Sequence, residues 1–254
     1  MLLAIDVGNT QTHIGAFEGD SLVEHWRFAT DGEDTADELA VRVTNLLALR
    51  GIELTAVDAS ITSSVVPRLN PEYARMCEQY LGRGCLMVGP GVRTGMAVRL
   101  DNPHELGADR LVNAVAAFES LGGPCAVVDF GTAITFDAVS AGGEYLGGVI
   151  GPGVQISMDA LTERAARLPK VDFAEPGGVI GRTTQASLQS GMVYGFAGAI
   201  DAIARRIKAE LGEDTSFVAT GGMAAAIVPY CETIEEVDDL LTLTGLRLIW
   251  ERNE

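Results

Sequence analysis

The sequence predicts an α/β protein built from two duplicated halves. Apolar strand-like runs alternate with segments whose apolar residues recur at helical spacing, which favours parallel strand pairing. An apolar strand runs into an Asp-x-Gly turn twice, at Asp6 and at Asp129, an offset of 123 residues (129 − 6). Because duplicated halves often enclose a ligand between them, we expect a cleft.

The first half is predicted to extend over residues 1–122. It opens with apolar runs separated by tight breaks, as in a β-meander, and the runs that follow alternate between helical and strand-like patterns. The expected strands are 2–5, 12–17, 22–28, 56–63 and 85–88, and the expected helices are 34–49, 71–81 and 108–121.

The second half, residues 123–254, begins after a Gly-Gly-Pro break and repeats the opening meander. Its apolar runs then lengthen into helical patterns, with one further strand that ends in two glycines. The expected strands are 125–129, 133–139, 144–150 and 216–219, and the expected helices are 154–168, 184–211 and a last one from residue 223.

Composition limits the classes of function. The 254 residues are 47% hydrophobic and 21% charged, which is typical of a folded globular protein. The formal net charge of −17 disfavours nucleic-acid and membrane-surface binding. No run is apolar enough to span a membrane, and no secretory leader pattern is present, so we expect a cytoplasmic protein with reduced cysteines.

Both Asp-x-Gly turns have the chemistry of phosphate contacts. Glycine lets the backbone approach a ligand closely, and consecutive amides together with Asn9, Thr10 or Thr132 can donate hydrogen bonds to phosphate oxygens. The two aspartates are anionic, so their natural partner is a cation that bridges protein and nucleotide. A single turn of this kind is more often an ordinary hairpin, but the duplication favours the nucleotide reading.

Other phosphate-binding devices are missing from the sequence. It contains no G-x-x-x-x-G-K-[ST], no G-x-G-x-x-G and no His-Arg-Asp catalytic loop. Its two lysines, Lys170 and Lys208, both follow residue 169, which leaves arginine, backbone amides and metal ions to neutralise phosphate charge.

Two further segments are candidates for the site. Gly221 and Gly222 follow an apolar strand and precede a helix, where small residues could admit adenosine or form a common strand-to-helix turn. Asp109 and Arg110 lie where a polar loop enters the helix expected from residue 108. Asp109 is either a helix cap, which would lower its pKa, or a base toward a substrate hydroxyl, and Arg110 could bind a carboxylate.

Six motifs in order resemble the type III pantothenate kinase family along nearly the whole chain. They are Asp-Val-Gly-Asn-Thr at 6–10, Gly-Ala-Asp-Arg at 107–110, Asp-Phe-Gly-Thr-Ala-Ile-Thr at 129–135, Gly-Gly-x-Ile-x-Pro-Gly at 147–153, Thr-Gly-Gly at 220–222 and Leu-Thr-Leu-x-Gly-Leu at 241–246. The resemblance implies two ribonuclease H-like lobes of the actin, sugar-kinase and Hsp70 type. It also implies a homodimer that phosphorylates pantothenate with ATP and needs Mg²⁺ and a monovalent cation, K⁺ or NH₄⁺.

The resemblance also implies roles for individual residues. Asp109 is the base, and Thr184 reaches pantothenate across the dimer interface. Asp129 is the monovalent-cation ligand, and Asp6 is a candidate Mg²⁺ ligand. The pantothenate loop is Gly107, Ala108, Asp109 and Arg110. The residues expected to contact ATP are Asp6, Val7, Gly8, Asn9, Thr10, Gln11, Thr12, His13, Thr132, Gly221 and Gly222.

The chain departs from the family pattern at Leu100, where the family often has tyrosine, and more mildly at Thr183, where the family often has asparagine. The Leu100 departure keeps open a kinase of the same fold that acts on another small acid or sugar. A non-catalytic nucleotide-binding regulator is the alternative from a different class, and the acidic composition disfavours direct DNA contact by such a regulator.

Overall fold

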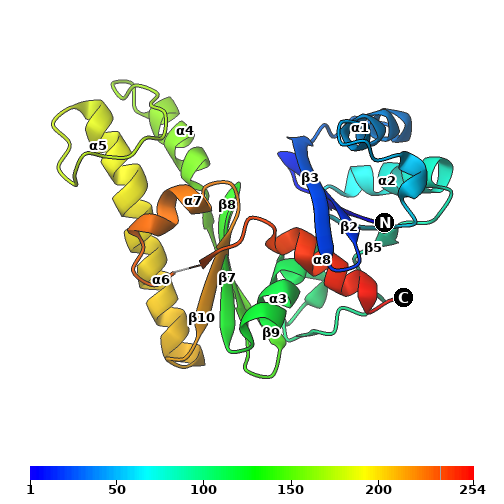
Figure 1. Ribbon diagram of the computed structural model, residues 1–254. Coiled ribbons are helices and arrows are strands. Elements are labelled where there is room, and N and C mark those ends of the chain that lie inside the picture. Colours follow the sequence, from blue (N-terminus) through cyan, green and yellow to red (C-terminus); the bar gives the residue numbers. More distant parts are fainter. Residues whose placement is uncertain (235) are drawn as a thin grey trace. The chain divides into compact units, whose positions relative to one another are not determined.

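The computed structural model describes residues 1–234 and 236–254, and the chain forms two compact units (Figure 1). The first unit contains residues 1–96, 101–116 and 240–254, and the second contains 97–100 and 117–239. The expected division at residue 122 differs from these units mainly at 240–254. This segment belongs to the first unit because its helix α8 (Leu241–Glu251) packs its apolar face on the strands of that unit.

The first unit is built on a mixed five-stranded sheet in the order β3-β2-β1-β4-β5. The expected meander is present, and β1 pairs antiparallel with β2 and parallel with β4. The bounds are β1 Leu2–Val7, β2 Gln11–Glu18, β3 Ser21–Ala29, β4 Ala59–Ser64 and β5 Leu86–Met87.

Helices cover both faces of this sheet. One face packs on α1 (Ala36–Ala48) and α2 (Asn70–Met76), and α2 continues into a π-helical turn over Cys77–Leu81. Helix α1 starts at a capping box in which the Thr35 hydroxyl accepts from the Glu38 N–H, as the acidic, threonine-bearing stretch predicts. The opposite face of the sheet receives α8.

Strand alternation decides which face of this sheet carries Asp6. Leu3, Ile5 and Val7 belong to the core beneath α1 and α2. Successive side chains of a strand point to opposite faces, so Asp6 lies on the other face, the one that packs on α8. The first part of α3 (Ala108–Leu121) joins α8 through a hydrogen bond from the Thr242 hydroxyl to Asn113 Oδ1 of 2.7 Å.

The second unit repeats this arrangement around a six-stranded sheet in the order β11-β10-β7-β8-β9-β6. Its run β9-β8-β7-β10-β11 matches β3-β2-β1-β4-β5 strand for strand, with antiparallel β7-β8 and parallel β7-β10 pairs. The bounds are β6 Ala97–Val98, β7 Cys125–Phe130, β8 Ala133–Val139, β9 Glu144–Pro152, β10 Ser216–Thr220 and β11 Glu236–Val237. The duplication predicted from the sequence is therefore present in the topology.

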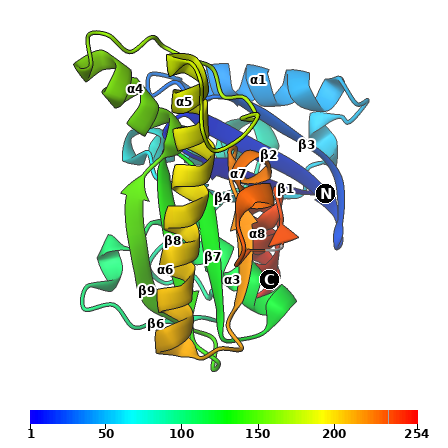
Figure 2. The same ribbon diagram turned by 90° about the vertical axis from the view of Figure 1, so that its left-hand side faces the viewer.

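Helix α6 runs along one face of this sheet (Figure 2) and contributes Ala197, Ile200 and Ala204 to the core. The helices of this unit are α4 (Val154–Arg164), α5 (Thr184–Ser190), α6 (Phe196–Leu211) and α7 (Ala224–Ile227). The helix expected over 184–211 is interrupted by a π-helical turn at Gly191–Gly195, where two glycines weaken the α-helical preference.

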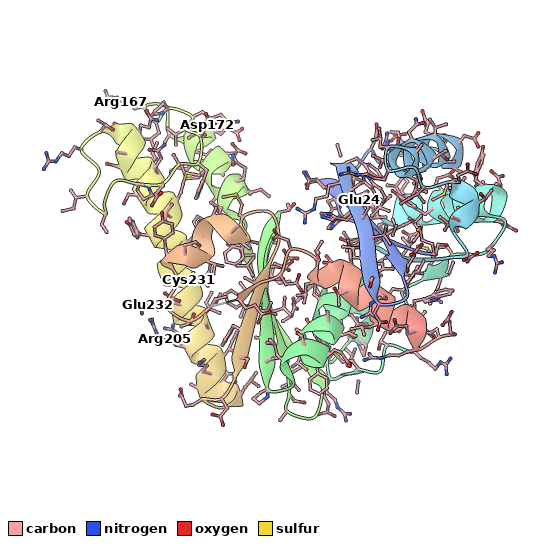
Figure 3. All side chains as sticks on the ribbon, in the orientation of Figure 1. Glu24, Arg167, Asp172, Arg205, Cys231 and Glu232 are labelled. Carbon is pink, nitrogen blue, oxygen red and sulfur yellow. The ribbon has the colours of Figure 1, made fainter. Side chains whose placement is uncertain are left out.

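A buried carboxylate fixes the segment between α7 and β11. Asp201, on α6, accepts hydrogen bonds from the Glu232 N–H at 2.9 Å, the Thr233 N–H at 3.0 Å and the Thr233 hydroxyl at 2.7 Å. Nearby on the surface, Arg205 forms an ion pair with Glu232 (Figure 3).

The helix expected from residue 223 is shorter than predicted. Helix α7 ends at Ile227, two residues before Pro229, and the last helix of the chain is α8.

None of the helices in the described part of the chain is both long enough and apolar enough to cross a membrane. All four cysteines are free thiols; Cys77 and Cys125 are buried, and Cys85 and Cys231 are partly exposed.

Substituting Gly245, in the middle of α8, tests how closely α8 approaches α3. A Cβ atom there would lie 2.2 Å from the backbone oxygen of Val112. Backbone atoms cannot turn aside as a flexible side chain can, so Gly245→Ala should lower the free energy of unfolding by about 1–3 kcal/mol. Thermal unfolding followed by circular dichroism measures the change.

Gly198→Ala in α6 is the matched control, because nothing lies within 4 Å of the Cβ it would add. Alanine is the better helix former, so this change should stabilise the protein by about 0.5–1 kcal/mol. An unchanged melting temperature for Gly245→Ala would contradict the tight α8–α3 packing.

Candidate active site

Asp6 is partly exposed at the end of β1 and is anchored from the neighbouring strand. The Ser63 hydroxyl donates a hydrogen bond of 2.6 Å to Asp6 Oδ1. The pKa of Asp6 is raised to about 7, chiefly because surrounding protein atoms remove the carboxylate from water. The Ser63 hydrogen bond opposes this rise, and the nearby charge of Asp109 adds to it.

The turn after Asp6 offers exposed polar groups. The Gly8 N–H donates to the Gln11 carbonyl at 3.1 Å, and a Cβ at Gly8 would lie 2.8 Å from that oxygen. The turn therefore requires glycine here. Asn9, Thr10 and Gln11 are exposed, so their polar groups can meet a ligand.

The remaining residues of the 6–13 segment point into the protein. Val7 and Thr12 are fully buried, and the Thr12 hydroxyl hydrogen-bonds Thr30 Oγ1 at 2.9 Å. His13 Nε2 pairs with His25 Nδ1 at 3.0 Å, and burial first, then the charges of Arg27 and His25, lowers the pKa of His13 to about 3. The accessible groups of this predicted ATP contact are thus Asp6 and residues 8–11.

Asp109 lies in the first turn of α3, which begins at Ala108 as predicted. Its Oδ1 accepts from the Arg110 N–H at 2.8 Å. A Cβ at Gly107 would lie 2.5 Å from the same oxygen, so glycine makes room for the carboxylate. The expectation that capping lowers the pKa of Asp109 is wrong: burial raises it, and the Arg110 N–H and charge offset this only in part.

Two carboxylates of the first unit thus form one electrostatic cluster. Asp6 comes from β1 and Asp109 from α3, 103 residues later (109 − 6), and the charge of Asp109 raises the pKa of Asp6. Like charges that are close together and partly removed from water disfavour each other's ionised form. The cluster is therefore suited to a cation or to a proton, the two species that relieve this repulsion.

The second unit places Asp129 beside the Thr-Gly-Gly motif. Strands β7 and β10 are parallel, and Asp129 pairs with Thr220 in register. Gly221 has φ +92°, and a Cβ there would lie 2.4 Å from Asp129 Oδ1 and 2.7 Å from the Phe130 nitrogen. Glycine is required at this position by both conformation and space.

Gly153 packs against the turn at residues 131–132. The Gly153 N–H donates to the Thr132 carbonyl at 3.1 Å, and a Cβ at Gly153 would lie 2.3 Å from that oxygen. Gly222, in contrast, has open space where a Cβ would be. The structure thus brings Asp129, Thr132 and Gly221 together in the second unit.

The remaining predicted pantothenate contact, Thr184, is exposed at the first position of α5. Its neighbour Thr183 is the N-cap, whose hydroxyl accepts from the Ala186 N–H at 3.1 Å. The helix start predicted from the sequence is confirmed, whereas the substrate contact stays a prediction.

The described residues contain no group of three or more His, Cys, Asp or Glu side chains placed to hold a metal ion. Mg²⁺ in kinases is commonly held by one or two carboxylates, substrate phosphates and water, so Asp6 alone fits that ion. Asp129 and the backbone oxygens of the adjacent turn are hard oxygen donors of the kind that K⁺ accepts.

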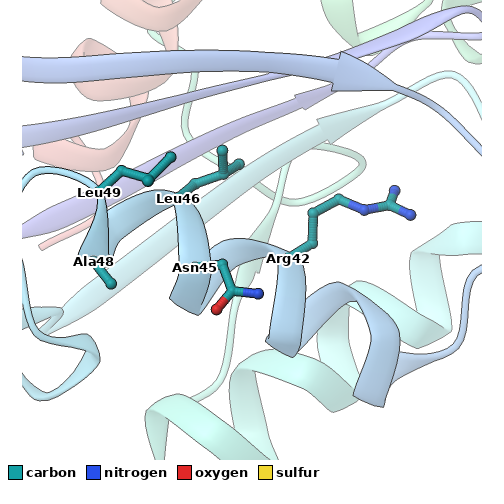
Figure 4. A pocket seen from close by; sticks show the side chains of 5 residues that line it. All are labelled: Arg42, Asn45, Leu46, Ala48 and Leu49. Carbon is teal, nitrogen blue, oxygen red and sulfur yellow. The ribbon is translucent and has the colours of Figure 1, made fainter.

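A surface pocket of about 450 Å³ lies on α1 (Figure 4). Its lining is Arg42, Asn45, Leu46, Ala48 and Leu49. None of the predicted site residues is among them.

Two residues that contact the candidate site were not predicted from the sequence as part of it. Ser63 reaches Asp6 only through the β1-β4 register, which the sequence does not display. Gly153 stood within a recognised motif, but its packing on the 131–132 turn depends on how β8 and β9 pair. A signal was present in both cases, namely a hydroxyl at the end of a strand and a glycine at the end of another.

Comparisons with known proteins agree on one family. A family model described as type III pantothenate kinase matches residues 2–206. The type III pantothenate kinases of Myxococcus xanthus (strain DK1622) and Anaeromyxobacter sp. (strain Fw109-5) are 52% and 54% identical to the chain over 253 residues, covering 100% of it and 99% and 100% of those proteins. The crystal structure of a putative 2-dehydro-3-deoxygalactonokinase from Sinorhizobium meliloti shares the fold, with a TM-score of 0.61, 13% identity and coverage of 99% of this chain and 96% of that one.

The raised pKa of Asp6 predicts a pH-dependent cost to stability. A carboxyl whose folded pKa, about 7, lies above its ordinary value of 3.8 contributes stability below pH 4 that is lost as the pH rises through 7. Asp6→Asn removes the ionisation, so it should stabilise the ligand-free protein relative to wild type at pH 8, by roughly 1–3 kcal/mol, and much less at pH 5. Chemical unfolding in magnesium-free buffer at the two pH values measures the difference.

Asp101→Asn, at an exposed carboxyl, is the control and should show no such pH-dependent gain. Equal effects of Asp6→Asn at pH 5 and pH 8 would show that the carboxyl ionises normally.

Proposed function

The chain belongs to the type III pantothenate kinase family, which phosphorylates pantothenate with ATP in coenzyme A biosynthesis, and we propose that Asp109 is the base of this reaction. The observation that carries this assignment is the position of Asp109 at the start of α3, electrostatically coupled to Asp6 at the end of β1. The two mixed sheets flanked by helices are those of the actin and sugar-kinase fold.

The chemistry of Asp109 follows from its surroundings. The hydroxyl oxygen of pantothenate forms a bond to the γ-phosphorus of ATP, the bond from that phosphorus to the leaving ADP oxygen breaks, and Asp109 accepts the hydroxyl proton. A raised pKa makes the carboxylate a better proton acceptor than an exposed aspartate. The Arg110 charge works against that rise and so favours the ionised form that a base requires.

We assign substrate binding to the loop around Asp109. Gly107, Ala108 and Arg110 are partly exposed beside it, and the Arg110 guanidinium suits the pantothenate carboxylate. Thr184, exposed at the start of α5, is assigned to pantothenate bound by a second copy of the chain.

We assign ATP to both turns and the Thr-Gly-Gly motif. Gly8, Asn9, Thr10 and Gln11 form an exposed turn at the end of β1, where backbone amides and polar side chains suit phosphate oxygens. In the second unit Thr132 belongs to the matching turn, and the open space at Gly222 suits a flat adenine or ribose. Val7, Thr12 and His13 support the turn from within the sheet.

The cations are assigned by donor chemistry. Asp6 would hold Mg²⁺, which neutralises phosphate charge when bound, and Asp129 with the adjacent turn would hold K⁺ or NH₄⁺. Local neutralisation of this kind is needed because the net charge of −17 repels ATP.

Exposed apolar side chains support the proposed homodimer. The second unit exposes Ile150, Ile156, Leu161, Val179 and Ile180, the last at 88%. They belong to the end of β9, to α4 and to the segment before α5, and α4 and α5 lie side by side in both ribbon views (Figures 1 and 2). A second copy packed there would bury these side chains and bring Thr184 into the interface. The free cysteines fit the reducing cytoplasm in which we place the enzyme.

Full-length similarity to pantothenate kinases supports pantothenate over the other acceptors that Leu100 left open. Leu100 lies beside Gly147, with 3.4 Å between its Cδ2 and the position of a Gly147 Cβ. An assay with Mg-ATP, K⁺ and pantothenate, compared with a panel of hydroxy acids and sugars, tests the substrate. A non-catalytic regulator would bind ATP and leave every acceptor unphosphorylated.

Asp109→Asn tests the base. The change keeps the shape of the side chain and removes its proton acceptor, so kcat should fall by about 10²–10⁴-fold. The Kd for ATP, measured by calorimetry, should stay within about threefold of wild type, because a base toward the acceptor hydroxyl makes its contribution in the transition state.

Glu119→Gln, at the exposed far end of the same helix, is the control and should leave kcat unchanged. Near-normal turnover of Asp109→Asn would show that Asp109 is not the base and has only a structural role in the first turn of the helix.

Asp129→Asn tests the monovalent-cation site. Wild-type activity should require K⁺ or NH₄⁺, and the K⁺ concentration for half-maximal activity should rise by more than the ~10-fold that loss of an outer-shell partner typically costs. Titrating K⁺ at constant ionic strength measures this. Asp214→Asn, exposed in the same unit, should behave as wild type, and an unchanged K⁺ dependence of Asp129→Asn would place the cation elsewhere.

A further inference from the structure

Ser63 is a buried residue near the end of β4. Its hydroxyl contacts Asp6, one of the two carboxylates of the electrostatic cluster in the first unit. We propose that Ser63 is a positioning residue for ATP binding: its hydrogen bond fixes the Asp6 carboxylate by one oxygen and leaves the other to hold the nucleotide-bound cation. This inference rests on the proposed role of Asp6.

The contact follows from sheet geometry. Strands β1 and β4 are parallel, and Asp6 and Ser63 are partners in their register. Partners in register carry their side chains on the same face, so a hydroxyl at 63 meets a carboxylate at 6 although 57 residues separate them in the chain (63 − 6). The 2.6 Å distance from Ser63 Oγ to Asp6 Oδ1 is that of a charge-assisted hydrogen bond.

A carboxylate needs such a partner to be preorganised. Rotation about the last side-chain bond of aspartate is broad and roughly two-fold, so an unanchored carboxylate samples many orientations. Within the described residues, the Ser63 hydroxyl is the side-chain group that donates a hydrogen bond to the Asp6 carboxylate. Ser63 is fully buried on an interior strand, so its hydroxyl is held in place. Its hydrogen bond therefore restricts the orientation of the Asp6 carboxylate.

The matching strands of the second unit also place a hydroxyl residue opposite their aspartate. Thr220 occupies the place opposite Asp129 that Ser63 occupies opposite Asp6. There the space beside the carboxylate is set by Gly221, whose absent Cβ would lie 2.4 Å from Asp129 Oδ1.

Ser60 provides a control that shows whether the effect comes from the contact with Asp6 or from the loss of any buried hydroxyl. It lies on the same strand, is 1% exposed against 0% for Ser63, and its Oγ has no hydrogen-bond partner within the described structure. Strand β4 therefore carries a buried hydroxyl away from Asp6 as well as the one that is bonded to Asp6. Ser60→Ala removes the same atom as Ser63→Ala and leaves Asp6 untouched.

The experiment measures Mg-ATP affinity by calorimetry together with steady-state kinetics. Ser63→Ala should weaken Mg-ATP binding by about 10-fold, the loss typical when a partner of a metal ligand is removed. The KM for ATP should rise in parallel while the KM for pantothenate stays within about twofold, because the carboxylate that Ser63 orients serves the nucleotide. Ser63→Cys keeps the branching of the side chain with a somewhat larger thiol that donates only weakly, so it should show the same defect. Ser60→Ala should bind as wild type.

A double-mutant cycle with Asp6→Asn shows whether Ser63 acts through Asp6. Ser63→Ala should add nothing to the loss of Mg-ATP affinity already caused by Asp6→Asn. If Asp6→Asn binds Mg-ATP normally, the assigned role of Asp6 itself fails. If Asp6→Asn weakens binding but both Ser63 variants bind as wild type, or if Ser63→Ala is equally harmful with and without Asp6, the positioning role is overturned.

Discussion

The pairing of one central strand with a parallel neighbour governs the chemistry of both units. β1 ends at Asp6 beside Ser63 of β4, and β7 ends at Asp129 beside Thr220 of β10. Parallel pairing aligns the carboxyl ends of neighbouring strands, so each sheet presents an aspartate, a hydroxyl residue and a glycine-bearing turn at one edge. The meanders, the covering helices and the close glycine contacts all serve to hold this edge.

Electrostatics then differentiates the aspartates. Burial raises the pKa of Asp6 and of Asp109, and the nearby charge of Asp109 raises the pKa of Asp6 further. An acidic protein that binds a polyanion must concentrate compensating groups where the phosphates lie, and a carboxylate cluster that favours a bound cation does so without a basic surface. Asp109 differs from Asp6 through Arg110, whose N–H and charge favour its ionised form.

Much of the fold could be predicted from the sequence because its signals are local. The opening meander, the start of α3 at Ala108 and the duplicated turns follow from strand alternation, helix periodicity and glycine placement. The return of α8 to the first unit could not be predicted, since an apolar helix face does not say which sheet it covers. The break between α5 and α6 was missed because the apolar periodicity continues through Gly191–Gly195.

The candidate site divides in the same way. Asp6, Asp109 and Asp129 were identified from motifs, but the burial that raises the pKa of Asp109 is a tertiary effect, and capping alone predicted the wrong direction. The contact of Ser63 with Asp6 was not predicted, because the sequences of β1 and β4 do not determine the register in which the two strands pair.

Burial, with a smaller contribution from the nearby charge of Asp109, holds the pKa of Asp6 far above its ordinary value. Carboxyl-carbon NMR of the ligand-free protein, recorded across pH and repeated in Asp109→Asn, tests it most directly. Asp6 should titrate near pH 7 in the wild type and at lower pH once the Asp109 charge is removed. An Asp6 carboxyl that titrates near its ordinary value of 3.8, unaffected by Asp109→Asn, would contradict the raised pKa.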